Sequence, residues 1–141
     1  MKKPLRISLF AAALLYAVVL AYVLFFWSRL IGYEQSWRSV NLRPFAEIAH
    51  AYLSGDGLVR SQFVQNIVLF APLGFLLPLL FPRAAGAFWK TALFALGVSV
   101  CAEIVQAFIG RSADIDDVIA NSLGAAGGYA LYVLAGAVLS K

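Results

Sequence analysis

Charged residues, cysteine and histidine are scarce in this 141-residue chain. Charged residues make up 13% of the sequence against 62% hydrophobic residues, and a water-soluble domain of this size has too much surface to tolerate that balance. Cys101 and His50 are single residues of their kinds, which argues against an internal disulfide, a Cys/His nucleophile pair and a His-rich or Cys-rich metal centre. The sequence also lacks a Gly-rich phosphate loop, a GxSxG elbow and an HExxH pair. We therefore expect a membrane protein with no metal and no cofactor, and we find no established catalytic motif.

The formal net charge of +4 does not indicate a nucleic-acid partner. The lysines and arginines are spread thinly between apolar segments and never form a basic stripe. Nucleic-acid binding is therefore not expected, and membrane lipids are the expected partners.

Four apolar segments are long enough to cross a membrane. A hydrocarbon core of about 30 Å needs about 20 residues of helix. We expect spans at about residues 7–28, 61–82, 90–110 and 117–139, and the short connection between the last two makes them antiparallel neighbours. The sequence thus predicts an all-α fold, a single integral membrane domain over residues 1–141 built as a four-helix bundle.

The only long connection covers residues 29–60, and part of it has a helical pattern. Phe45, Ile48, Ala49 and Tyr52 recur at i, i+3, i+4 and i+7. We expect a short amphipathic or re-entrant helix in this first extracytoplasmic loop.

The basic residues outside the spans give the orientation. Six lysines and arginines lie on the side of the two termini and five on the side of the long loop, which also carries every acidic residue outside the spans. This slight bias predicts a multi-pass protein of the bacterial cytoplasmic (inner) membrane with both termini in the cytoplasm.

Glu103 is the single ionisable residue inside an expected span. A carboxylate there costs several kcal/mol unless it finds partners or stays protonated. Ser99, Gln106 and Gly110 share its helix face. Two interpretations remain open: Glu103 is functional, or it reaches the interface or hydrogen-bonds a neighbouring helix.

Three aspartates stand at the start of the fourth span. Asp114 is suited to cap this helix, and Asp116 and Asp117 in its first turn suit the positive end of the helix dipole. Capping explains one carboxylate better than it explains three beside Arg111. We therefore favour a functional site or a polar network.

Other polar and small residues are interpreted as packing positions. Gln62, Asn66 and Asn121 are expected to hydrogen-bond between helices, and Gly124 and Gly128 to permit close helix packing.

Several of these residues occur in blocks that together resemble the VanZ-like family of bacterial membrane proteins. The blocks are Asn41-Leu42-Arg43-Pro44-Phe45, Asn66 followed by Phe70-Ala71-Pro72-Leu73-Gly74-Phe75, Glu103-Ile104-Val105-Gln106, Gly110-Arg111, and Asp114-Ile115-Asp116-Asp117-Val118 continuing to Gly124. The resemblance runs from about Asn41 to Tyr129. It implies a four-helix inner-membrane protein related to the one that raises resistance to the glycopeptide antibiotic teicoplanin, and it supplies no mechanism. The positions that the motifs carry over, all expected near the outer face, are Arg43, Asn66, Glu103, Gln106, Arg111, Asp114, Asp116, Asp117 and Asn121.

Three functional hypotheses follow from these observations. The preferred one is an envelope protein whose outer polar pocket binds an anionic or amphiphilic ligand, such as a lipid headgroup, a cell-wall precursor or a lipoglycopeptide, with Arg43 and Arg111 holding anionic groups. The alternative is an enzyme that acts on a lipid-linked, phosphorylated substrate with Glu103 as general base. A transporter ranks last, because the inner halves of the spans lack polar residues. A small-residue face also permits a homo-oligomer.

Overall fold

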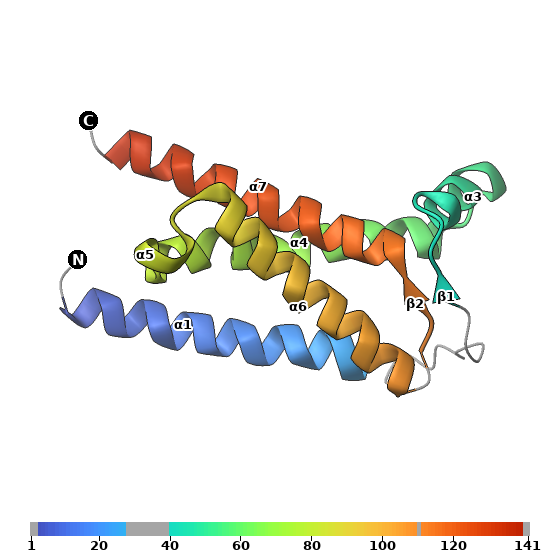
Figure 1. Ribbon diagram of the computed structural model, residues 1–141, viewed down its shortest axis with the longest axis horizontal. Helices are drawn as coiled ribbons and strands as arrows, with labels where there is room; N and C mark the ends of the chain where they lie inside the picture. Colours follow the sequence, from blue (N-terminus) through green and yellow to red (C-terminus); the bar gives the residue numbers. More distant parts are fainter. Residues whose placement is uncertain (1–2, 28–39, 110, 140–141) are drawn as a thin grey trace.

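Four long helices run along the molecule (Figure 1). A computed structural model describes residues 3–27, 40–109 and 111–139; the remaining residues of the expected outer loop, and Gly110, lie outside the described residues. The long helices are α1 (Lys3–Tyr22), α4 (Gly57–Leu80), α6 (Phe88–Phe108) and α7 (Ile115–Leu139), and a π-helical segment, η1 (Val23–Trp27), continues α1.

These helices confirm the predicted all-α membrane bundle. Stretches apolar and long enough to cross a membrane cover Lys3–Phe26, Gly57–Leu80, Phe88–Phe108 and Ile115–Val138. Each boundary lies within four residues of the one expected from the sequence, because the length of an apolar run is what a bilayer dictates.

Short elements complete the described fold. The predicted loop helix is α3 (Ala46–Ser54), and α5 (Pro82–Ala85) is one turn between α4 and α6. Two strands that the sequence did not predict, β1 (Val40–Asn41) and β2 (Ala113–Asp114), pair in parallel, with Val40 opposite Ala113 and Asn41 opposite Asp114.

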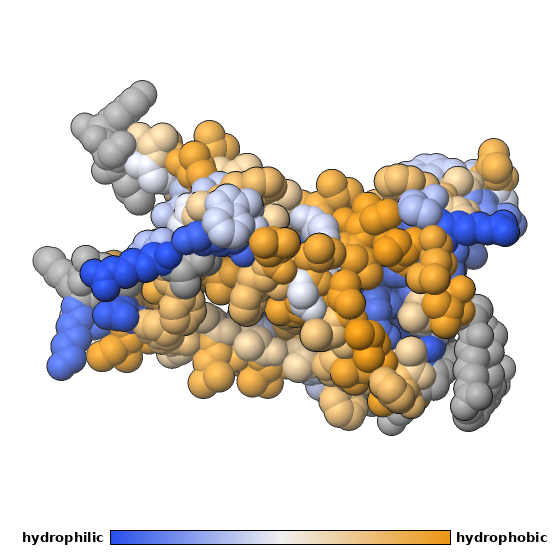
Figure 2. Space-filling model, in the orientation of Figure 1, coloured by the Kyte–Doolittle hydropathy of each residue, from blue (hydrophilic) through white to orange (hydrophobic). Residues whose placement is uncertain are grey.

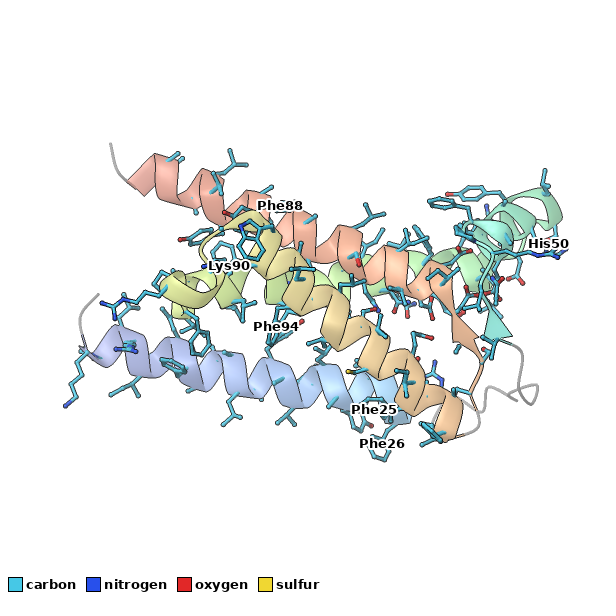
Figure 3. All side chains as sticks on the ribbon, in the orientation of Figure 1. Phe25, Phe26, His50, Phe88, Lys90 and Phe94 are labelled. Atoms are coloured by element: carbon cyan, nitrogen blue, oxygen red, sulfur yellow. The ribbon has the colours of Figure 1, made fainter. Side chains whose placement is uncertain are left out.

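The start of α1 and the end of α7 lie at one end of the bundle, whereas β1, β2 and α3 lie at the other (Figure 1). We call the second the polar end. In Figure 3 His50 of α3 points away from the helices there, and Phe25 and Phe26 mark the same end of the α1 segment. Both termini therefore share a side, as expected, and the assignment of that side to the cytoplasm stays a prediction.

Helices α4 and α7 pack backbone to backbone through glycines. A Cβ added at Gly128 would lie 1.9 Å from the carbonyl oxygen of Ala71, and one added at Gly74 would lie 1.9 Å from that of Ala125. One added at Gly124 would lie 2.1 Å from the carbonyl oxygen of Ile67 on α4. The packing role predicted for the α7 glycines is confirmed, and Gly74 adds a position on the facing helix.

The helix α1 joins the bundle through a small apolar core. Leu20 and Leu24 are buried with Phe70 of α4 and Ala102 of α6. The hydroxyl of Tyr16 also donates a hydrogen bond to a backbone carbonyl of α4 at 2.8 Å. The polar end of α1 is thereby held beside α6, where the candidate site lies.

The outward surface of the long helices is hydrophobic. In Figure 2 hydrophobic residues cover the middle of the molecule, and hydrophilic residues gather toward its ends. Leu14, Leu15, Val68 and Leu134 are all more than half exposed. Because exposed apolar area is unfavourable in water, this surface fits a multi-pass membrane protein surrounded by lipid.

Candidate functional site

Asp116 fixes the outer helix α3 to the start of α7. Its carboxylate is buried and accepts hydrogen bonds from the backbone N–H of Phe45, of Glu47 at 3.1 Å and of Ile48 at 3.2 Å. The first turn of a helix has no intrahelical partner for these N–H groups. Phe45 itself has a φ of 62°, a left-handed conformation that is costly without such support. Asp116 therefore stands in the first turn of α7, as predicted, and caps α3 as well.

Asp114 connects three parts of the polar end. Its Oδ1 accepts hydrogen bonds from Nδ2 of Asn41 at 3.0 Å and from the backbone N–H of Asp116 at 2.8 Å, which confirms its predicted capping role. Its own N–H donates to Oε2 of Glu103 at 2.9 Å. Through these bonds β1, the start of α7 and the buried carboxylate of α6 form one network.

Glu47 belongs to the same network, although it was not among the predicted site residues. A hydrogen bond with the Asp114 carboxyl, then burial, then repulsion from the neighbouring aspartates raise the pKa of Glu47 to about 8. Glu47 therefore keeps its proton at neutral pH and is hydrogen-bonded to the Asp114 carboxyl. Glu47 falls between the apolar positions of the predicted loop helix, and the sequence contains no signal for a partner so distant along the chain.

Gln106 and Arg111 are both held by the end of α1. Nε2 of Gln106 donates to the carbonyl oxygen of Leu24 at 2.9 Å, and Nη1 of Arg111 donates to the same oxygen. A carbonyl in the last turn of a helix is available for such donors. Burial lowers the pKa of the Arg111 guanidinium, while the carboxylates of Asp117 and Glu103 raise it. Arg111 thus stands at a fixed place between α1 and α6.

Two amide side chains join helices, as expected. Asn66 of α4 hydrogen-bonds the carboxyl of Asp117, and Nδ2 of Asn121 donates to Oγ of Ser99 at 2.8 Å. Oδ1 of Asn121 is buried and has no hydrogen-bond partner among the described atoms. The expectation for Gln62 was wrong, because its side chain is exposed on α4 instead of packed against another helix.

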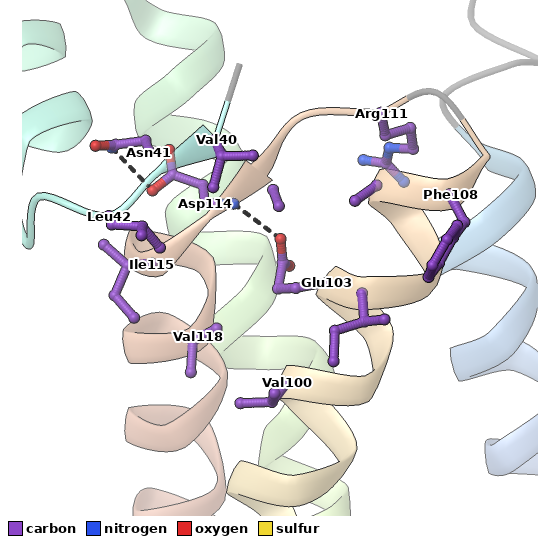
Figure 4. A pocket seen from close by; sticks show the side chains of 13 residues that line it. Val40, Asn41, Leu42, Val100, Glu103, Phe108, Arg111, Asp114, Ile115 and Val118 are labelled. Carbon is purple, nitrogen blue, oxygen red and sulfur yellow. Dashed lines mark hydrogen bonds between the residues drawn. The ribbon is translucent and has the colours of Figure 1, made fainter. Parts of the chain in front are cut away.

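A cavity of about 610 Å³ opens between α6, β1 with the residue after it, and the start of α7 (Figure 4). Its walls are mainly apolar, and its charged members come from the polar network. The apolar side chains include Val100, Ile104, Phe108, Ile115 and Val118, and the charged ones are Glu103, Arg111 and Asp114. Among the described residues, no three His, Cys, Asp or Glu side chains are placed to share a metal ion.

The nine predicted positions therefore separate into three groups. Glu103, Arg111 and Asp114 line the cavity. Arg43 lies on the exposed turn before α3, where its backbone N–H donates to Oδ1 of Asn41, and it does not line the cavity. The remaining five do not line the cavity and instead form hydrogen bonds that join the elements around it: Asn66, Gln106, Asp116, Asp117 and Asn121.

Comparison with known proteins agrees with the resemblance seen in the sequence blocks. No curated protein and no solved structure matches the chain. The family model of VanZ/LLP1 matches residues 13–136, which include the second half of α1, the whole of α4 and α6, most of α7 and every residue of the polar network. The chain belongs to the VanZ/LLP1 family of membrane proteins.

Proposed function

We propose that this protein binds an anionic or amphiphilic ligand of the bacterial cell envelope in the cavity between α6 and α7, and that this binding contributes to resistance against teicoplanin and related glycopeptides. The observation that carries the proposal is a cavity that joins apolar walls to a positioned arginine. The ligand classes that fit are a lipid headgroup, a cell-wall precursor and a lipoglycopeptide, since each combines an apolar part with a polar one.

The apolar walls suit the acyl chain of such a ligand. Phe108 is 86% exposed and Ile104 is 51% exposed, and both lie on a helix that is apolar and long enough to cross a membrane. The cavity is therefore accessible from the side as well as from the polar end. A chain could enter it from the lipid without crossing water.

Arg111 suits the anionic part. A guanidinium binds carboxylate or phosphate through two parallel hydrogen bonds. The Leu24 carbonyl already holds Arg111, so less side-chain entropy is lost when an anion binds. Partial burial also strengthens the attraction, because the effective dielectric constant is lower than in water.

The proposal is tested by antibiotic susceptibility. A sensitive Gram-positive host would express the wild type, Arg111→Gln, Glu103→Gln and the control Gly127→Ala, in which the added methyl meets open space. Membrane abundance of every variant would be equalised. Protection against teicoplanin by the wild type and Gly127→Ala, lost in the other two, is the expected result. Full protection by both cavity variants would refute a role for the cavity.

Glu103 supports a second candidate function, a membrane enzyme that acts on a lipid-linked phosphorylated substrate. The Glu103 carboxylate lines the cavity, and the N–H of Asp114 fixes one of its oxygens, as a positioned general base requires. Only turnover separates this candidate from binding. The purified chain would be incubated with a phosphorylated polyprenol lipid, and product formation that Glu103→Gln abolishes would favour the enzyme, whereas an unchanged substrate would favour binding alone.

Residence in the bacterial cytoplasmic membrane with both termini in the cytoplasm is part of the proposal. Single cysteines would replace Leu53 on α3 and Arg83 on α5, with Cys101 changed to serine; both positions are exposed and lie at opposite ends of the bundle. A membrane-impermeant thiol reagent added to intact cells should label the first position and not the second. The reverse pattern would invert the topology.

A further inference from the structure

The charges around the cavity are unequal. Two carboxylates, Glu103 and Asp114, line it against one guanidinium, Arg111. Behind its walls stand the further carboxyls of Asp116 and Asp117, which act electrostatically on the network. Among the described residues around the cavity, negative groups therefore outnumber positive ones.

The raised pKa of Glu47 is consistent with the same excess of negative charge. Its pKa of about 8 means that this carboxyl keeps a proton at neutral pH, when an isolated one would have lost it. Repulsion from Asp114, Asp117 and Asp116 is among the causes. Asp116 accepts hydrogen bonds from the N–H groups of α3 behind the cavity wall, and Asp117 interacts with Asn66 and Arg111, whereas Asp114 and Glu103 line the cavity itself, where one guanidinium faces both carboxylates.

These two carboxylates have acceptor capacity left for a ligand. The hydrogen bonds described above use Oε2 of Glu103 and Oδ1 of Asp114, and the Asp114 carboxyl is also hydrogen-bonded to Glu47. A carboxylate offers about four acceptor sites on its two oxygens. A primary ammonium group carries three donors and a positive charge, so it supplies what this side of the cavity lacks.

We propose that the cavity binds a zwitterionic aminophospholipid, whose ammonium group contacts Glu103 and Asp114 and whose phosphate contacts Arg111. This inference rests on the proposed function and names the class of its ligand. The apolar walls select a lipid over a soluble amine, because Ile104 and Phe108 face the acyl chains from a membrane-length helix. A phospholipid without an amine would bring a phosphate to Arg111 and no cation to the two carboxylates that line the cavity.

Native mass spectrometry of the full chain in neutral detergent tests this directly. The probes are phosphatidylethanolamine, its N-acetylated derivative and phosphatidylglycerol, with identical acyl chains. The N-acetylated lipid keeps the phosphate and loses the positive charge, so its comparison with phosphatidylethanolamine requires no variant protein. Glycerophosphoethanolamine, which has the headgroup and no acyl chains, separates a lipid from a soluble amine.

Two variants with equal loss of charge locate the ammonium site. Glu103→Gln removes a carboxylate from the cavity. Asp56→Ser removes one that lies at the start of α4 outside the cavity, and serine still caps that helix through its hydroxyl. Both variants would be compared at equal concentration and in the same detergent.

We expect phosphatidylethanolamine to bind about tenfold more tightly than either other lipid, and this preference to be lost in Glu103→Gln and kept in Asp56→Ser. Binding of glycerophosphoethanolamine should be at least tenfold weaker than that of the lipid. Equal or tighter binding of phosphatidylglycerol would overturn the aminophospholipid and leave the proposed function in place. Tighter binding of glycerophosphoethanolamine would overturn the choice of a lipid. Binding of no lipid at all would overturn the aminophospholipid and leave a cell-wall precursor or a lipoglycopeptide as the ligand of the proposed function, which the susceptibility assay tests separately.

Discussion

Gly128→Ala tests how closely α4 and α7 must approach each other. The new methyl carbon would lie 1.9 Å from the carbonyl oxygen of Ala71, against 3.4 Å for ordinary contact, a shortfall of 1.5 Å. The atoms that it meets belong to the backbone of α4 and cannot rotate away. The helices must therefore separate along the interface that places the polar end of α7.

The expected cost combines two opposing effects. Overpacking of this kind costs about 1–3 kcal/mol, and occasionally more. Replacing glycine by alanine within a helix returns up to about 1 kcal/mol of helix propensity. Gly127→Ala is the matched control, because it is one residue away on the same helix and meets nothing within 4 Å. Its propensity gain is the same, so the difference between the two variants isolates the steric cost, which should be about 1–3 kcal/mol.

Reversible unfolding in mixed micelles, driven by a rising fraction of dodecyl sulfate, measures this difference as a shift of the midpoint. Gly128→Ala should unfold at a lower fraction than the wild type, and Gly127→Ala at an equal or higher one. Equal midpoints for the two alanine variants would show that α4 and α7 do not pack through their backbones, and would refute the reasoning.

Three further predictions concern the polar end and the bundle interior. Asp116→Asn should make α3 much more sensitive to limited proteolysis, because about 1.5–3 kcal/mol of charged hydrogen bonding is weakened. Asp56→Asn makes the same loss of charge at the N-cap of α4 and should leave α3 protected; equal sensitivity would contradict the capping role. The raised pKa of Glu47 means that docking of α3 is most stable below about pH 4.5 and loses stability as pH rises through about 8. Protection of α3 from proteolysis should therefore be greater at about pH 6 than at about pH 9, and Glu47→Gln should abolish this pH dependence. A pH dependence that persists in Glu47→Gln would show that other groups cause it. Ser99→Ala should lower the unfolding midpoint by the equivalent of about 0.6–2 kcal/mol, because it removes the hydrogen-bond partner of the buried Asn121 amide on α7. Ser122→Ala should cost less, because the Ser122 hydroxyl donates to a carbonyl of its own helix; the opposite order would refute the pairing of Ser99 with Asn121.

The parts of this fold that sequence predicted are those set by local rules. A bilayer demands apolar runs of about 20 residues, so the four long helices were visible within four residues of their ends. Helical periodicity placed Ser99, Glu103 and Gln106 on one face, and all three are buried. The glycines of α7 likewise indicated close packing before a partner helix was known.

The parts that sequence missed depend on which distant segments meet. The pairing of β1 with β2 involves two residues from each segment, too few to leave a periodic pattern. Asp116 looked like an ordinary first-turn acid of α7, and nothing local shows that its carboxylate caps α3. Glu47 was overlooked for the same reason, because its partner Asp114 is reached only when the loop folds back onto α7.

Three of the predicted site residues line the cavity, whereas Arg43 does not. Glu103, Arg111 and Asp114 meet at the cavity because α6 and α7 are antiparallel and joined by a short connection. Arg43 came from a sequence block that also contains Asn41, and only the asparagine side chain reaches the network. A family block thus identified the right segment, and the geometry of its turn decided which side chain lies at the cavity.

The central claim is that the cavity holds an amphiphile by its anionic group. Its most direct test is retention, in native mass spectrometry, of a phospholipid over diacylglycerol with the same acyl chains. The variants are Arg111→Gln, which removes the cation, Ile104→Trp, which fills the cavity, and Val105→Trp, which places the same new side chain in the neighbouring apolar groove beside α1. We predict that the wild type and Val105→Trp retain the phospholipid selectively and that Arg111→Gln and Ile104→Trp do not. Selective retention that survives in both cavity variants would contradict the account.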